Sequence, residues 1–186
     1  MMRCNVYMTK EEGKLLIEAL TLLLAIVASI AALVQWRRDQ SWKRAEKLDS
    51  MFKEFESNRL IQIACRILDW NRGKFSFPDG DKIEFEHEDV VKSLVLHDEV
   101  KECTFTQTQA RMRDAYDSLL SFFDRLESAI DGGLVDGPKA LRLFGYWIQH
   151  LDKMPEHQDC GQAAMKYIAR YGSLGSFDSL CGRIGR

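Results

Sequence analysis

The chain has 186 residues, of which 46% are hydrophobic and 29% are charged, a balance typical of a folded protein rather than a disordered one. Its 26 Lys and Arg against 28 Asp and Glu give a formal net charge of −2. Three cations and three carboxylates precede residue 37, so the remainder of the chain carries the same net charge. Proteins that bind nucleic acid generally have a basic surplus that neutralises phosphates, and this chain has no strong signal of that kind.

The five cysteines form an odd set without a C-x-x-C pair: Cys4, Cys65, Cys103, Cys160 and Cys181. A disulfide scaffold or a zinc site would show a paired spacing. We therefore expect free and mostly buried thiols in a reducing compartment. The sequence also lacks H-E-x-x-H, G-x-S-x-G, P-loop and dinucleotide-binding patterns, so we expect neither a metal nor a cofactor.

An apolar segment near the N-terminus, residues 15–35, predicts a transmembrane helix that follows an extracytoplasmic stretch, residues 1–14. Glu18 is its only charged residue, and the uncharged run from Ala19 to Gln35 contains 17 residues. As a helix this run is about 26 Å long, and the turn before it extends the length to the roughly 30 Å of a bilayer core.

Two other structures are compatible with such a segment. A buried core helix would normally have a polar face, but only Thr21 and Ser29 interrupt the apolar surface between Ala19 and Val34. A cleavable signal peptide would have a short basic leader and a shorter apolar run, whereas Glu11 and Glu12 lie in this leader. We therefore favour a retained anchor.

The flanking cations indicate the orientation of the span. Five follow it closely: Arg37, Arg38, Lys43, Arg44 and Lys47. Only three precede it, so we expect the inner (cytoplasmic) membrane, with the N-terminus outside and the C-terminal domain in the cytoplasm. Trp36 and Trp42 fit an interfacial aromatic belt on the cytoplasmic side.

Small residues within the span favour helix–helix contact. Ala25 and Ser29, and Ala28 and Ala32, are pairs at four-residue spacing, which allows two helices to approach closely. We therefore expect a homo-oligomer. Glu18 has two interpretations: its carboxylate extends to the nearby membrane surface, or, in an oligomer, a ring of carboxylates lines a water-filled mouth.

The rest of the chain predicts a mainly α fold. Residues 36–71 contain neither Pro nor Gly and predict a linking helix with a bend near Ser57 and Asn58. A cytoplasmic helical-bundle domain, residues 72–186, follows. Alternating apolar residues on either side of a Pro-Asp-Gly turn predict a β-hairpin insertion over residues 74–86.

Helices make up the remainder of this domain, beginning with a short one near residues 88–97. A capping box at Thr106 and Gln109 and a stop at Gly132-Gly133 bound a central helix, residues 107–131. A helix over 138–154, capped by Asp136 or Gly137, and two short helices over 158–171 and 175–183 follow. The central helix carries Arg113, Asp114, Asp117 and Asp124, which we interpret as a polar network rather than a metal site.

Arg142 and His150 form the nearest match to a catalytic arrangement. Helical domains of the HEPN superfamily that cleave RNA use an Arg and a His separated by four to six residues on one helix. Seven residues separate Arg142 from His150, so the spacing departs from that pattern. Eight steps of about 100° place the two side chains about 80° apart around the helix and about two turns apart along it. We therefore assign no catalytic residue and keep this pair as an alternative.

Three segments carry a resemblance: residues 111–136, residues 144–151 (FGYWIQHL) and residues 167–180 (YIARYGSLGSFDSL). They resemble small bacterial proteins of unassigned function that have one N-terminal span and a cytoplasmic helical domain. The layout is also similar to that of the membrane accessory protein of RNA-targeting CRISPR systems. That resemblance implies spans that assemble into a pore around HEPN-like domains.

These observations favour a non-enzymatic, homo-oligomeric membrane protein, a candidate pore or effector in phage defence. We expect a protein partner on the cytoplasmic side. Two alternatives stay open. One is a membrane-tethered HEPN-like ribonuclease that uses Arg142 and His150, and the other is a tethered adaptor or sensor domain.

Overall fold

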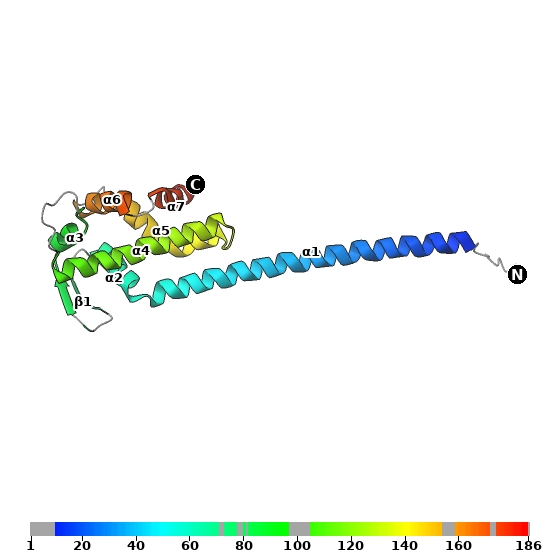
Figure 1. Ribbon diagram of the computed structural model, residues 1–186, viewed down its shortest axis with the longest axis horizontal. Coiled ribbons are helices and arrows are strands. Elements are labelled where there is room, and N and C mark those ends of the chain that lie inside the picture. Colours follow the sequence, from blue (N-terminus) through cyan, green and yellow to red (C-terminus); the bar gives the residue numbers. More distant parts are fainter. Residues whose placement is uncertain are drawn as a thin grey trace. The chain divides into compact units, whose positions relative to one another are not determined.

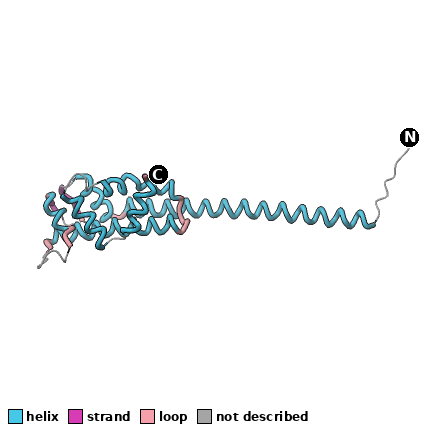
Figure 2. The backbone as a smooth tube through the Cα atoms, turned by 90° about the horizontal axis from the view of Figure 1, so that it is seen from above, coloured by secondary structure: helices cyan, strands magenta, loops and turns pink. Residues whose placement is uncertain are grey.

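The computed structural model describes residues 10–70, 73–77, 80, 82–96, 105–153, 159–171 and 174–185. The fold is mainly α-helical, as predicted, and its described part contains seven helices and one two-stranded antiparallel sheet (Figures 1 and 2). The chain divides into two compact units, residues 1–43 and 44–186, which we describe one at a time.

The first unit consists, in its described part, of residues 10–43 of helix α1, which covers Lys10–Ser57. Two hydroxyl side chains in the apolar run bond to the backbone of their own helix. Thr21 Oγ1 donates to the Ile17 carbonyl over 2.8 Å, and Ser29 Oγ donates to the Ala25 carbonyl over 2.8 Å. Neither hydroxyl therefore needs a partner outside the helix.

Asn58 separates α1 from α2 (Arg59–Trp70), at the position where the sequence predicts a bend. Its N–H donates to the Glu54 carbonyl, which completes the last turn of α1. Its side-chain oxygen accepts from the N–H groups of Leu60 (3.0 Å) and Ile61 (3.3 Å), as an N-cap residue does. One residue thus ends the first helix and begins the second.

The predicted hairpin is confirmed by strands β1 (Gly73–Ser76) and β2 (Lys82–Phe85), which pair antiparallel with Phe75 opposite Ile83. The rings of Phe75 and Phe85 stack with centroids 5.0 Å apart on the buried face. Gly80 has a φ of 90°, which explains a glycine in this turn. Pro78 and Asp79, the other residues of the predicted turn, lie outside the described part.

Helix α3 covers His87–Ser93 and is shorter than the predicted helix over 88–97. The N–H of Leu94 donates to the Val91 carbonyl and closes the last turn of α3. Residues 95 and 96, the two described residues that follow, are not helical. His97 lies outside the described residues.

Helix α4 (Gln107–Asp131) has the predicted bounds and is the central helix of the second unit, because it contacts α2, α3, α5, α7 and β2 (Figure 1). Thr106 and Gln109 form the predicted capping box. At the other end Leu134 N–H donates to the Ala129 carbonyl, and Gly133, with a φ of 64°, takes the left-handed conformation that such a helix stop requires.

An aromatic cluster holds three helices of the second unit together. Phe55 comes from the end of α1, Phe122 from α4, and Phe144 from α5 (Gly137–Lys153). Their ring centroids lie 5.0 to 5.2 Å apart in tilted and edge-to-face arrangements, and all three rings are buried. The core of this unit therefore includes the last turns of α1.

The last two helices, α6 (Asp159–Tyr171) and α7 (Leu174–Ile184), agree with the two short helices predicted from the sequence. The α7 helix is bound to α4 by polar contacts around the buried carboxylate of Glu127. Ser179 Oγ donates to Glu127 Oε1 over 2.8 Å, and Arg183 pairs with both Glu127 and Asp131. These contacts compensate the burial of a charged group.

Asp136 is the N-cap of α5 and gives a testable prediction. Its side chain accepts from Lys139 N–H over 3.1 Å and lies 3.2 Å from the Lys139 ammonium, and these contacts lower the pKa of the carboxyl group. We expect Asp136→Ala to lower the free energy of unfolding by about 1 kcal/mol at neutral pH. Urea denaturation of the full chain in detergent, followed by circular dichroism, measures the difference.

The pH dependence of this loss has a defined sign. Because folding lowers the pKa, the carboxylate contributes stability above its unfolded pKa, near 3.8, and that contribution is lost as the pH falls below this value. Asp136→Asn is the matched control, since Asn keeps the capping oxygen without the charge and should retain most of the stability. An alanine variant as stable as the wild type at neutral pH contradicts the capping role.

Candidate functional site

The most unusual feature of the structure is the number of large apolar side chains that α1 exposes. Twelve large apolar side chains of this helix are exposed: Leu15, Leu16, Ile17, Leu20, Leu22, Leu23, Leu24, Ile26, Val27, Ile30, Leu33 and Val34. In the described part of the second unit, by contrast, only four large apolar or aromatic side chains are exposed. An apolar patch of this extent marks a surface that contacts a membrane or another protein. Helix α1 is long and apolar enough to cross a membrane.

The residues predicted to line a pore or an oligomer contact all lie on this surface. Ala25, Ala28, Ser29 and Ala32 are exposed, so their small side chains are accessible to a neighbouring helix. Glu18 is also exposed, and its Oε1 lies 4.0 Å from Lys14 Nζ, one turn nearer the N-terminus. The pairing directs the carboxylate towards the N-terminal end of the apolar run.

Arg142 and His150 lie on α5, about 12 Å apart along the helix axis, and the described contacts of each are with different neighbours. Nε2 of His150 is 3.2 Å from the Leu68 carbonyl oxygen and 3.8 Å from Asp69 Oδ1. Arg142 is exposed, and its charge acts on Asp136, at the beginning of the same helix. The described contacts therefore do not join Arg142 and His150 in one site.

His150 instead belongs to a small polar cluster between α2 and α5 that the sequence did not predict. Its ring stacks on Tyr146, with centroids 5.7 Å apart, and the Tyr146 hydroxyl donates to Asp69 Oδ1 over 3.0 Å. This hydrogen bond and the carboxylate charge raise the pKa of Tyr146, so the phenol remains protonated at neutral pH. The cluster ties two helices together and offers no phenolate nucleophile.

A cavity of about 380 Å³ lies between α4 and α6, where the sequence predicts a polar network. The guanidinium carbon of Arg113 lies 4.6 Å from the ring centroid of Tyr167 and 5.0 Å from that of Tyr171, and Nη1 donates to the Val95 carbonyl. The Tyr167 hydroxyl donates to Asp117 Oδ1 over 2.6 Å, and burial together with this bond raises its pKa. The cation and the carboxylate are thus both engaged within the fold.

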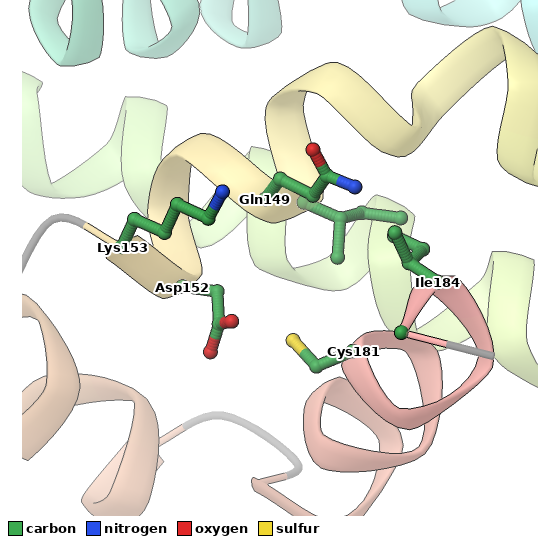
Figure 3. A pocket seen from close by; sticks show the side chains of 7 residues that line it. Gln149, Asp152, Lys153, Cys181 and Ile184 are labelled. Atoms are coloured by element: carbon green, nitrogen blue, oxygen red, sulfur yellow. The ribbon is translucent and has the colours of Figure 1, made fainter.

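A second cavity, of about 200 Å³, lies between α5 and α7 (Figure 3). The Cys181 thiol faces Asp152 across it, and burial and this carboxylate raise the pKa of the thiol to about 12. Burial likewise raises the pKa of Cys65 to about 12. Both are free cysteines, as predicted, and at neutral pH both are protonated. Cys4 and Cys103, and the side chain of Cys160, lie outside the described part.

Within the described residues, no group of three or more His, Cys, Asp or Glu side chains is arranged to hold a metal ion. The second unit therefore presents packed polar clusters, while the first unit presents an uncovered apolar surface. We take the surface of α1 as the candidate functional site.

No family model, no curated protein and no solved structure matches this chain. The resemblance to single-span bacterial proteins, and to the membrane protein of RNA-targeting CRISPR systems, stays a prediction.

The raised thiol pKa values predict slow alkylation of the folded protein. A shift from 9.0 to about 12 is three units, so at pH 8 the folded chain should hold about a thousandfold less thiolate at Cys65 and Cys181. Peptide mapping by mass spectrometry after iodoacetamide treatment, with and without denaturant, measures the two rates.

The same shifts determine how stability depends on pH. Because the thiolate is disfavoured only in the folded state, these thiols contribute stability below pH 9 that is lost as the pH rises towards about 12. Equal alkylation rates in the folded and unfolded chains contradict the assignment of these two thiols as groups that folding keeps protonated.

Proposed function

We propose that this chain is a single-span protein of the inner membrane, whose N-terminus lies outside and whose helical domain lies in the cytoplasm. The observation that supports this proposal most strongly is the exposed apolar surface of α1. Removing twelve large apolar side chains from water is favourable by on the order of 20 kcal/mol. Water is therefore an unfavourable environment for this surface, and a bilayer can cover a single apolar helix on all sides, which supports a membrane location.

Backbone and hydroxyl groups support the same proposal. In a lipid core every polar backbone group must bond internally, and a continuous helix satisfies this requirement. The hydroxyls of Thr21 and Ser29 bond to carbonyls of α1 itself. Arg37 and Arg38 directly follow the apolar run and favour a cytoplasmic location of what comes after it.

The domain acts in this proposal as a binding and assembly module rather than as an enzyme. Tyr146, Cys65 and Cys181 are held in their protonated forms by burial or by neighbouring carboxylates. Arg142 and His150, the residues of the ribonuclease alternative, have separate contacts. No contact among the described residues favours that alternative, and we propose no reaction.

Association of copies through the span completes the proposal. Ala25, Ala28, Ser29 and Ala32 give α1 a small, exposed face that permits close approach of a second α1 helix. In a ring of such helices the Glu18 carboxylates would line the mouth of a pore. A protein of this kind would act in phage defence by making the membrane permeable to ions. In the tethered adaptor, the alternative, the anchor only places the domain at the membrane.

Extraction and protection experiments test the anchor. We expect the full chain to stay with the membrane pellet in alkaline carbonate and to be released by detergent. Its domain should be digested by protease in inverted membranes but protected in sealed spheroplasts, because the domain lies in the cytoplasm. The intact mass of the membrane-bound protein should include the span.

Each result excludes a competing interpretation. A chain that remains in the soluble fraction shows that α1 is not a membrane helix. A mass that lacks the apolar segment identifies a cleaved signal peptide. Digestion of the domain in sealed spheroplasts reverses the orientation.

A paired substitution tests the association of copies. Ala28→Ile adds bulk to the small face and should shift the protein in mild detergent from oligomer towards monomer in a light-scattering mass measurement. Ala19→Ile is the matched control, because Ala19 is nine residues away and therefore about half a turn around the helix. A wild-type protein that is strictly monomeric, or equal effects of the two variants, contradicts association through this face.

Measurement of membrane potential separates the pore from the adaptor. Overexpression of a pore depolarises the cell, and the effect should be lost when residues 15–35 are replaced by an unrelated span. An adaptor leaves the potential unchanged and keeps its function with the replaced span.

A further inference from the structure

The segment directly after the apolar run, residues 36–43, combines aromatic and cationic side chains on an exposed helix surface. Trp36 is 58% exposed and Trp42 is 73% exposed. Arg37, Arg38 and Lys43 are also exposed. We call this stretch, all of it in the first unit, the basic-aromatic segment.

The cations of the basic-aromatic segment have no ionic partner among the described residues. In the described part of the chain, Arg37, Arg38 and Lys43 form no ion pair. Asp39 is the one acidic residue of the segment, and its carboxylate accepts a hydrogen bond from Gln35 Nε2 over 3.0 Å. The segment thus carries a local excess of two positive charges, whereas the whole chain has a net charge of −2.

The position of these positive charges along α1 places them beside lipid headgroups if the apolar run spans a membrane. Eight residues of helix are about 12 Å long, enough to pass through the headgroup layer, which adds roughly 5–8 Å to each side of the hydrocarbon core. Arg37 and Arg38 are about 100° apart around the helix, and Lys43 is about 140° beyond Arg38. The cations therefore surround the helix, so at least one of them faces lipid for any rotation of the span.

We propose that the basic-aromatic segment binds the headgroups of anionic phospholipids in the cytoplasmic leaflet. This inference rests on the proposed membrane span. The guanidinium and ammonium groups match the charge of the lipid phosphate, and the two indoles hold the segment at the depth of the headgroups, where tryptophan is favoured. The anchor in this view selects its lipid surroundings in addition to crossing the bilayer.

Spin-labelled lipids test this proposal on the full chain. The protein is reconstituted in phosphatidylcholine vesicles that contain a trace of spin-labelled phosphatidylglycerol or spin-labelled phosphatidylcholine. The fraction of immobilised label in the electron spin resonance spectrum gives the association constant of each lipid for the protein. We expect phosphatidylglycerol to associate about fivefold more strongly per contacted cation at low salt, since one such contact is worth about 1 kcal/mol.

Removal of the three cations should abolish the preference. The variant Arg37→Gln, Arg38→Gln, Lys43→Gln should bring the ratio of the two association constants close to one, as should high salt in the wild type. The matched control removes three exposed cations of the domain instead, by Lys74→Gln, Lys92→Gln and Lys139→Gln, and should keep the wild-type ratio.

The outcomes separate the lipid proposal from the proposed span. Immobilised label with a ratio of one in the wild type overturns lipid selection and leaves the span intact. An equal loss in the control variant also overturns it, because the preference then depends on overall charge. The absence of immobilised label for both lipids overturns the span and, with it, the lipid proposal.

Discussion

The apolar surface of α1 is the constraint on which the functional interpretation depends. From Leu15 to Val34 the helix exposes one large apolar side chain after another, and the described part of the chain buries none of this surface. The second unit is packed without the apolar surface of α1, because it has a continuous core of its own around α4. The chain therefore combines an apolar segment, which needs a membrane or a protein partner to cover it, with a domain that has its own complete core.

The domain unit begins within the helix that carries this surface. Phe55, in the last turns of α1, packs against Phe122 and Phe144, so the end of α1 belongs to the domain core. Asn58 then ends α1 and begins α2, which allows the chain to turn into the bundle. The division of the chain after residue 43 thus falls inside one helix rather than in a loop. The two units therefore share one helix.

Local signals in the sequence explain which elements were predictable. The capping box at Thr106 and Gln109 and the Gly133 stop act within a few residues, and they gave α4 its observed bounds. The hairpin and the bend at Asn58 have similar short-range causes. The hydrogen bond between Tyr146 and Asp69 joins residues 77 positions apart, so no local sequence pattern predicts it. Arg113, predicted to lie on a polar face, has its guanidinium over the rings of Tyr167 and Tyr171, which come from α6, more than 50 positions later in the chain.

The hydroxyls of Thr21 and Ser29 have a consequence for the proposed association of copies in a bilayer. Each donates its proton to a carbonyl one turn back on its own helix, so neither can donate a hydrogen bond to a neighbouring helix unless it gives up that bond. In the proposed oligomer, attraction between neighbouring helices would derive mainly from van der Waals contact over a few alanines, which is weak for each pair. Crowding of chains per unit area, and hence the level of expression, would govern the extent of assembly.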